Sequence, residues 1–249
     1  IIGVGRSRKQ ENKCNNNFQY ISCDLQNDDI LSLLPKAVDV IIHLAGDGRS
    51  FINPANYTSQ IDANILMTSL LADYAVSTGV KLIIYASSVY VYSGCQAPFR
   101  EKIINLPTEN LGASKLGSES LLKSRSLVGQ FKSICLRIFT VYGPHSSAYQ
   151  FIPEAIMKIQ SSEPEVTFCS PNIKRDFIFI DDVVKAIISS IGLIDSNINS
   201  ETFNVGTGIS TSIKGIIGML MNLLDSNKTI NYISNNQQNN LDITHIADI

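Results

Sequence analysis

The stretch that decides the fold reads LIIYASSVYVYS at residues 82–93 and is followed, after a polar loop with prolines, by LGASK at residues 111–115. The apolar run 82–86 is typical of a buried strand, and the second segment opens a helical pattern that continues to about Leu127. A hydroxyl at the carboxyl end of a strand, with a lysine in the first turns of the next helix, is a reaction-centre layout in open α/β folds. Ligands of such folds bind beyond the strand ends.

The composition restricts the class of protein. With 249 residues, of which 44% are hydrophobic, the chain can bury a sizeable core and fits one domain, or one domain with a small lobe. The formal net charge is −2 and no basic block stands out, so nothing indicates a nucleic-acid partner. No apolar run approaches the roughly 20 residues of a membrane span, and no signal-peptide pattern is present, so we expect no membrane partner.

The cysteines and histidines indicate a reduced protein without a metal site. The cysteines are odd in number, widely spaced and without a C-x-x-C pair, so structural thiols in a cytoplasmic protein are favoured over metal ligands. They are Cys14, Cys23, Cys95, Cys135 and Cys169. The three histidines are scattered, and His43, inside an apolar run, is predicted to be a core histidine.

The stretch from residue 82 to residue 119 resembles the extended short-chain dehydrogenase/reductase family, which contains the nucleotide-sugar epimerases and dehydratases. Members read roughly YASSxxVYG…PYGxSKxxxE, and this chain reads YASSVYVYS…ENLGASKLGSE. The resemblance implies that Ser88 is the catalytic Ser/Thr and that Lys115 is the lysine of the family's Tyr-x-x-x-Lys pair. The tyrosine position, four residues before Lys115, is occupied by Leu111.

Further motifs extend the resemblance over nearly the whole chain in the family's order. They are HLAG at 43–46, RIFTVYGP at 137–144, RDFIFIDDV at 175–183, FNVGTG at 203–208 and THIADI at 244–249. Together they imply an α/β fold, a Rossmann-like doubly wound parallel sheet with a small C-terminal substrate lobe. We expect an NAD(P)-binding domain over residues 1–150 and a mixed substrate-binding lobe over residues 151–249, from which some elements return to the main domain.

One part of the family's pattern does not occur. There is no G-x-G-x-x-G loop, and residues 1–5 resemble the family's second strand. We therefore expect the first domain to be N-terminally incomplete, without the first strand and the Gly-rich loop. The helix N-terminus that follows such a loop holds the pyrophosphate, so we expect the 249-residue chain to bind dinucleotide weakly or not at all. The THIADI segment normally leads into a final helix, so the carboxyl end also resembles a cut end.

The resemblance also assigns positions that would contact the cofactor. Arg6 stands where the family carries an acid for the ribose of NAD, and an arginine there accommodates the 2′-phosphate of NADP. NADP is therefore slightly favoured over NAD, with a solvated basic turn as the alternative. Asp24 and Leu25 match the segment at the adenine edge, although an aspartate in a turn or at a helix N-cap is an equal alternative. The other predicted cofactor positions are Leu44, Ala45, Gly46, Asn64, Ala86, Ser87, Lys115, Thr140 and Val141.

Substrate-facing positions follow from the same motifs. In the family, the tyrosine takes the proton of a sugar hydroxyl as hydride leaves for NAD(P), the lysine lowers the pKa of the tyrosine, and the Ser/Thr orients the oxygen. Leu111 cannot transfer a proton, so Tyr90, Tyr92 or Tyr142 is a candidate substitute, with packing or substrate lining as the alternative. An arginine that enters a strand facing the cleft is suited to a bidentate grip on a diphosphate. The predicted substrate residues are Ser88, Tyr92, Thr140, Tyr142 and Arg175.

Two functional hypotheses result. The first is a nucleotide-sugar epimerase, dehydratase or reductase that uses NAD(P), acts in the synthesis of surface-polysaccharide sugars and has altered or impaired acid/base chemistry. Such an enzyme is an isomerase, a lyase or an oxidoreductase. The second is a catalytically silent paralogue that binds a nucleotide sugar or a dinucleotide. In either case the expected partners are a nucleotide sugar and a second copy of the chain in a homodimer.

Overall fold

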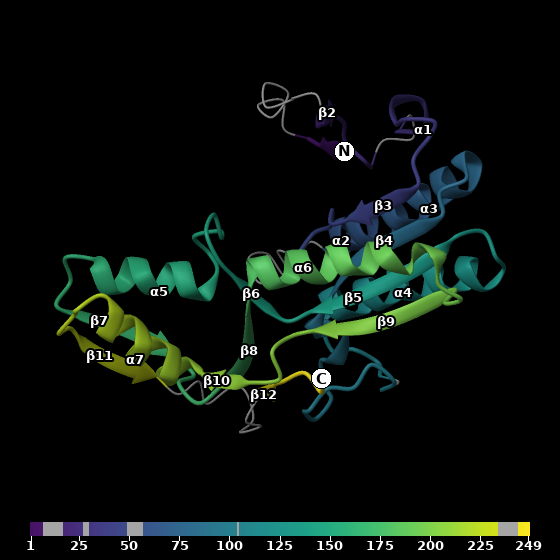
Figure 1. The fold of residues 1–249 in the computed structure, drawn as a ribbon. Coiled ribbons are helices and arrows are strands. Elements are labelled where there is room, and N and C mark those ends of the chain that lie inside the picture. The colour runs from purple at the N-terminus through teal and green to yellow at the C-terminus, as the bar shows by residue number, and fades with distance from the viewer. Residues whose placement is uncertain (7–16, 27–29, 49–56, 104, 234–243) are drawn as a thin grey trace. The chain divides into compact units, whose positions relative to one another are not determined.

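The computed structural model describes residues 1–6, 17–26, 30–48, 57–103, 105–233 and 244–249. Cys14 lies outside these residues. Within them the chain is a mixed α/β protein with parallel strand pairs, as the sequence predicts (Figure 1). Two compact units interleave along the chain. Unit 1 consists of Ile1–Gly94, Asn105–Arg137 and Ile187–Phe203, and unit 2 consists of Cys95–Ile104, Ile138–Ala186 and Asn204–Ile249.

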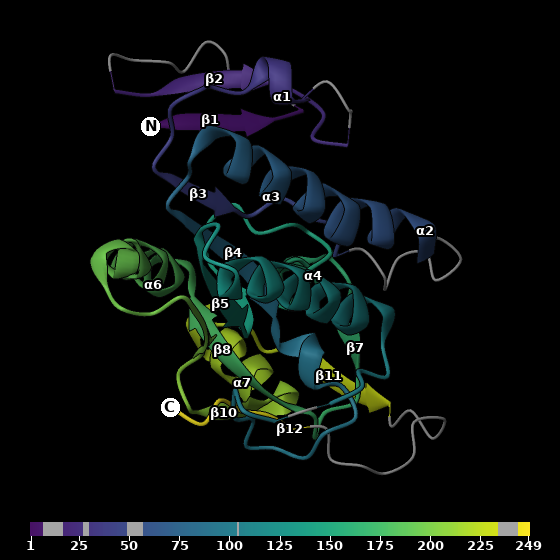
Figure 2. The same cartoon turned by 90° about the vertical axis from the view of Figure 1, so that its right-hand side faces the viewer.

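The sheet of unit 1 is present as two hydrogen-bonded pieces. The first piece is the parallel pair of β1 (Ile2–Gly5) and β2 (Gln19–Ser22). The second has the order β3-β4-β5-β9, with strands Val40–His43, Leu82–Ser88, Lys132–Ile138 and Ser200–Val205. Strands β3 and β4 are parallel. The β1–β2 pair lies beside the β3 edge of the larger piece (Figure 2).

One long helical region follows β3, and its middle has π geometry. The sequence predicts a helix over residues 55–77; residues 55 and 56 lie outside the described part, and the rest forms α2 (Tyr57–Gln60), the π-helix η3 (Ile61–Leu66) and α3 (Met67–Thr78). The sequence also predicts that Gly79 ends this helix, and it does. Its φ is 73°, a left-handed conformation that glycine adopts without strain, and its N–H donates to the carbonyl of Ala75.

The core of unit 1 lies around β4. Leu82, Ile83, Ile84 and Tyr85 are all at most 1% exposed, because this parallel strand is covered on both faces. Helices α3 and α4 (Asn110–Leu127) pack against each other in this unit. Between β4 and α4, the chain forms the 3₁₀-helix η4 (Val89–Tyr92). A short helix, α1 (Ile30–Leu33), follows β2. Fully burying one such aliphatic side chain contributes about 1.5–3 kcal/mol, so β4 is a main stabilising element.

Strand β8 (Lys174–Phe179) is the centre of unit 2. It pairs in parallel with β6 (Thr140–Tyr142) and β12 (Thr244–His245), and antiparallel with β10 (Ser210–Ser212). Strands β7 (Glu165–Cys169) and β11 (Thr229–Ile233) form a separate parallel pair. Helices α5 (Phe151–Gln160) and α7 (Ile213–Leu223) share an apolar core with that pair (Figure 1). Helix α6 (Ile180–Ile191), followed by the 3₁₀-helix η5 (Gly192–Asp195), leads back into unit 1.

A buried carboxylate explains two of the motifs in unit 2. Asp176 is fully buried and accepts hydrogen bonds from the N–H and hydroxyl of Thr207, at 2.8 and 2.7 Å, and from the N–H of Gly208 at 2.9 Å. A Cβ at Gly206 would lie 2.7 Å from the Asp176 carboxylate. The aspartate of the RDF segment therefore fixes the loop of the FNVGTG segment, and glycine at 206 leaves the required space.

Candidate active site

The carboxyl end of β4 carries Ser88. This residue is extended, with φ −146° and ψ 150°, and its Oγ accepts a hydrogen bond from the N–H of Tyr90 at 3.3 Å. The serine thereby caps η4, and the chain turns away from the sheet immediately after it. The strand end thus presents a half-buried hydroxyl where ligands of parallel α/β sheets bind.

Lys115 reaches the same strand end from α4. Its ammonium donates a hydrogen bond of 2.8 Å to the carbonyl oxygen of Ala86, two residues before Ser88, and lies 4.7 Å from the centre of the Tyr85 ring. The side chain is buried. Burial lowers the pKa of Lys115 to about 8, against a smaller opposing effect of the Glu119 carboxylate. The lysine and the serine that the sequence singles out therefore lie at one end of β4.

Asn64 joins three segments beside this lysine. The side chain is completely buried in η3; its Oδ1 accepts from the N–H of Asp47 at 3.0 Å, and its Nδ2 donates to the Asp47 carbonyl at 3.2 Å and to the Ser114 hydroxyl at 2.9 Å. A Cβ at Gly46 would lie 2.6 Å from Asn64 Oδ1 and 3.1 Å from Lys115 Nζ. The loop after β3, the π-helix and α4 are therefore interlocked, and π insertions are frequent at functional sites.

His43 belongs to the core beneath this arrangement. It is 2% exposed, its Nε2 lies 2.9 Å from the hydroxyl of Thr68, and its ring centre lies 5.1 Å from that of Tyr85. Burial first, and then the charge of Lys115, lower the pKa of His43 to about 3. The histidine is thus neutral at physiological pH, and the predicted core position is confirmed.

The position that would carry the proton-transfer tyrosine is apolar and buried. Leu111 is 5% exposed in the first turn of α4, where its carbonyl accepts from the Ser114 hydroxyl at 3.0 Å. Tyr92 is also buried, with the guanidinium carbon of Arg137 4.8 Å from its ring centre. This placement favours the packing role for Tyr92. Tyr90, in the same 3₁₀-helix, is half-buried.

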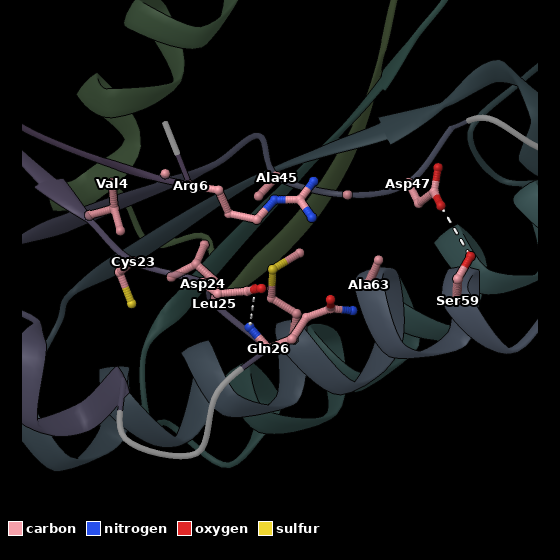
Figure 3. A pocket seen from close by; sticks show the side chains of 13 residues that line it. Val4, Arg6, Cys23, Asp24, Leu25, Gln26, Ala45, Asp47, Ser59 and Ala63 are labelled. Carbon is pink, nitrogen blue, oxygen red and sulfur yellow. Dashed lines mark hydrogen bonds between the residues drawn. The ribbon is translucent and has the colours of Figure 1, made fainter. Parts of the chain in front are cut away.

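A cavity of about 160 Å³ lies where β1, β2 and β3 end (Figure 3). Five of the predicted cofactor residues line it, namely Arg6, Asp24, Leu25, Ala45 and Gly46. The Arg6 side chain extends toward Ala45 (Figure 3). Oδ1 of Asp24 accepts from the N–H of Gln26 at 3.1 Å, as expected of the turn aspartate that is the alternative for this residue. Leu44 is 59% exposed and does not line the cavity.

The other wall of this cavity was not predicted from the sequence. Ser59, Ala63 and Met67 line it from one face of the helical region, and Asp47 accepts a hydrogen bond from the Ser59 hydroxyl at 3.1 Å (Figure 3). The spacing of four residues along the helix was the signal that could have identified this face. A cationic side chain, small residues and a nearby buried lysine fit a dinucleotide, whose diphosphate and ribose groups need donors and close backbone approach.

The remaining predicted residues belong to unit 2. Thr140, Val141 and Tyr142 form β6, and Arg175 lies on β8. Nε of Arg175 is buried without a hydrogen-bond partner in the described part of the chain. His245 is its register partner on β12, and burial first, and then the Arg175 charge, lower the pKa of His245 to about 4. Unit 2 thus keeps a guanidinium with unused donor capacity next to a neutral imidazole.

Comparison with known proteins identifies the family. The model of the NAD dependent epimerase/dehydratase family matches residues 1–206. The chain belongs to the NAD-dependent epimerase/dehydratase family. A curated relative is UDP-glucuronate 4-epimerase of Thermodesulfobacterium geofontis, 30% identical over 234 residues, which are 91% of this chain and 70% of that protein.

Two solved structures of family members resemble the chain closely. UDP-N-acetylglucosamine 4-epimerase from Methanobrevibacter ruminantium M1, in complex with UDP-N-acetylmuramic acid, has a TM-score of 0.86 and 26% identity, covering 100% of this chain and 81% of that one. UDP-glucuronic acid 4-epimerase from Bacillus cereus, in complex with UDP-glucuronic acid and NAD, has a TM-score of 0.82 and 25% identity, covering 94% and 78%. The Rossmann-like fold and the membership in a family of NAD-dependent nucleotide-sugar enzymes are therefore confirmed.

Two further candidate features are not found in the described residues. No cluster of three or more His, Cys, Asp or Glu side chains there could hold a metal ion. None of the helices in the described part of the chain has the length and apolar character needed to span a bilayer.

Proposed function

We propose that this chain is an NAD(P)-dependent nucleotide-sugar enzyme of the epimerase, dehydratase or reductase type, with impaired proton transfer. One observation carries the proposal: Lys115 binds the carbonyl of Ala86 at the end of β4 that also carries Ser88, while Leu111, at the position where the motif would have its tyrosine, is apolar and buried. The relatives, two of which are complexed with UDP-sugars, support the substrate class. We also propose that the enzyme acts in the synthesis of sugars for surface polysaccharides.

The cofactor would occupy the cavity of unit 1, with low affinity in the 249-residue chain because no Gly-rich loop holds its pyrophosphate. Bound there, it would supply hydride acceptance and donation at the sugar carbon. Lys115 would bind the nicotinamide ribose through its ammonium, and Gly46 would let the backbone approach the ligand closely. Asn64 would hold the Gly46–Asp47 loop, and Arg6 would accept the 2′-phosphate of NADP. We infer that NADP is accepted at least as well as NAD; the Bacillus cereus relative was crystallised with NAD.

The substrate would be held through its hydroxyls and its diphosphate. Ser88 would orient the sugar hydroxyl by a hydrogen bond, and Thr140 and Tyr142 would line the sugar. Arg175 would bind the diphosphate, since a guanidinium offers two parallel N–H donors to phosphate oxygens. Its buried, unpartnered Nε supports this role.

The second candidate function is a silent paralogue, which Leu111 favours. The same residues would then bind nucleotide sugar or dinucleotide without turnover. For either function we propose a cytoplasmic homodimer. The free thiols of Cys23, Cys95, Cys135 and Cys169 are in keeping with a reducing compartment.

Calorimetric titration with UDP-sugars and with NAD and NADP, followed by a turnover assay, tests the proposal. Binding with slow turnover supports the impaired enzyme, and binding without turnover supports the silent paralogue. If no nucleotide sugar binds at millimolar concentration, the enzyme function is wrong; if no dinucleotide binds either, the silent paralogue is wrong as well.

A further inference from the structure

A buried ion pair lies beneath the strand end that carries Ser88. Arg137, on β5, donates from Nη2 to Glu119 Oε2 at 2.7 Å and from Nε to Oε1 at 3.0 Å, and both side chains are 7% exposed. Taking two charges out of water is costly, and an apolar pair of similar volume is often as stable. Stability alone is therefore a weak reason for this pair.

The Arg137–Glu119 ion pair contacts the chain both before and after Ser88. The hydroxyl of Ser87, the residue before it, donates a hydrogen bond to Glu119 Oε1. The guanidinium of Arg137 lies 4.8 Å from the ring centre of Tyr92, the last residue of the 3₁₀-helix that begins directly after Ser88. The five residues from Ser88 to Tyr92 are thus anchored at both ends to one buried charge cluster.

The same carboxylate also belongs to the helix of the lysine. Glu119 lies four residues after Lys115 on α4, so both side chains are on one face of that helix. Lys115 in turn binds the carbonyl of Ala86, the residue before Ser87. Glu119 therefore links the strand end that carries Ser88 to the helical turn that carries Lys115.

We propose that Glu119, held in place by Arg137, is a positioning residue that fixes Ser88 relative to Lys115 and keeps Lys115 in its charged form. The inference rests on the proposed function, because it concerns the same two side chains. On this proposal, the Arg137–Glu119 ion pair serves to set the geometry and the charge of the site around Ser88 and Lys115.

The surroundings of Lys115 make its charge depend on Glu119. The groups that face it are the carboxylate of Glu119 on its own helix, the imidazole of His43 on β3, the ring of Tyr85 on β4 and the amide of Asn64 on η3. His43 and Asn64 are uncharged at neutral pH. Burial lowers the pKa of Lys115, and the Glu119 carboxylate is the group that opposes this effect. Without it, the amine should release its proton at lower pH.

The test follows the titration of Lys115 in the unliganded protein. In protein labelled with [¹³Cε]lysine, the Lys115 resonance is assigned by its loss in Lys115→Arg, and its midpoint is measured in wild type and in Glu119→Gln. We expect the midpoint to fall by about half a pH unit or more. The matched control is Asp73→Asn, which breaks the 2.6 Å ion pair with Arg125 further along α4 and should leave the midpoint unchanged. An unchanged midpoint in folded Glu119→Gln would overturn the proposal.

The positioning of Ser88 has its own readout. The N–H of Tyr90 binds Ser88 Oγ, so its hydrogen-exchange rate reports whether the strand end stays ordered. We expect exchange at least about tenfold faster in Glu119→Gln than in Asp73→Asn. Equal rates in the two variants would show that Glu119 does not hold the strand end.

A second variant covers the case in which Glu119→Gln fails to fold because Arg137 is left buried without its partner. Replacing both by glutamine removes both charges and should preserve the fold better. The Lys115 midpoint should still fall because the carboxylate is the nearer charge, but by less than in Glu119→Gln since the positive charge of Arg137 is removed as well; an unchanged midpoint here also overturns the proposal. These measurements need no ligand. A failure of nucleotide-sugar binding in the wild type would defeat the proposed function and leave the Lys115 result standing.

Discussion

The two sides of the candidate site in unit 1 differ in how completely they are built. On the cofactor side, Asn64 satisfies the backbone of Asp47, Lys115 binds the end of β4, and Gly46 leaves the space between them. On the side where we expect proton transfer, Leu111 is buried at the proposed tyrosine position and Tyr92 packs beneath Arg137. We infer from this difference that binding geometry and acid/base chemistry are separable in this fold, and we propose that this chain keeps part of the first without the tyrosine that would carry the proton.

The largest expected effect comes from restoring the tyrosine. In Leu111→Tyr, in protein that also carries the Gly-rich loop, turnover of a nucleotide sugar should rise by about tenfold or more, since a positioned acid/base group contributes about 10²–10⁴-fold and the activating Lys115 is present. Steady-state assays at millimolar cofactor, with circular dichroism to check the fold, measure it. Brisk wild-type turnover with no gain in the variant would mean that another residue is the base, and Tyr90 would be tested next.

On the cofactor side, Gly46→Ala should be the most damaging small change. The new Cβ would lie 2.6 Å from Asn64 Oδ1, an atom that is buried and hydrogen-bonded and so cannot move freely. We expect destabilisation by about 1–3 kcal/mol and loss of cofactor binding. Gly48→Ala, where a Cβ would meet nothing within 4 Å among the described residues, is the matched control. Chemical denaturation measures the stability of both variants. Equal stability of Gly46→Ala and Gly48→Ala would contradict the claim that the loop after β3 is interlocked with Asn64.

Lys115→Met should remove cofactor binding but stabilise the fold. The folded pKa is about 8 against an unfolded value of 10.5, and one pKa unit corresponds to about 1.4 kcal/mol. Allowing for the lost hydrogen bond to Ala86, we expect a gain of about 1–3 kcal/mol at pH 7. Between pH 8 and 10.5 the unfolded wild type binds more protons than the folded form, so wild-type stability rises with pH and the gain shrinks. Urea unfolding across this range measures it, and a variant less stable at pH 7 would contradict the cost assigned to the buried ammonium.

A smaller effect is expected for Arg6→Ala at the cavity. In protein that also carries the family's first strand and Gly-rich loop, the variant should bind NADP about five- to tenfold more weakly while NAD affinity is unchanged, because the guanidinium would contact only the 2′-phosphate. Paired titrations with the two dinucleotides measure the ratio. If the ratio of the NADP and NAD affinities is the same in the variant as in the wild type, Arg6 belongs to a solvated basic turn and does not bind the 2′-phosphate.

The smallest effect should come from Tyr92→Phe. In a Leu111→Tyr background we expect turnover to change by less than about threefold, with stability lower by about 1 kcal/mol from the lost hydroxyl. The packed ring beneath Arg137 is retained. A hundredfold loss of turnover would instead assign proton transfer to Tyr92.

Local patterns predicted much of the fold and part of the site. The apolar run of β4, the helix end at Gly79 and the positions of Ser88 and Lys115 follow from periodicity, glycine chemistry and motif spacing. The π geometry around Asn64 could not be predicted in this way. It depends on hydrogen bonds between Asn64 and Asp47, and on those with Ser114 and Ser118, which are 50 or more positions away in the sequence. Contacts between distant segments, such as Ser87 with Glu119, have no signature in either segment alone.

The rate of hydride transfer in the wild type tests most directly whether Leu111 impairs proton transfer. Rapid mixing of the chain with a bound UDP-sugar and millimolar NAD or NADP, followed by absorbance of the reduced cofactor, measures it in a single turnover. We expect the nucleotide sugar to bind and the cofactor to be reduced far more slowly than the roughly 1–10³ s⁻¹ of ordinary enzymes. Reduction within that ordinary range, with Leu111 in place, would contradict this expectation.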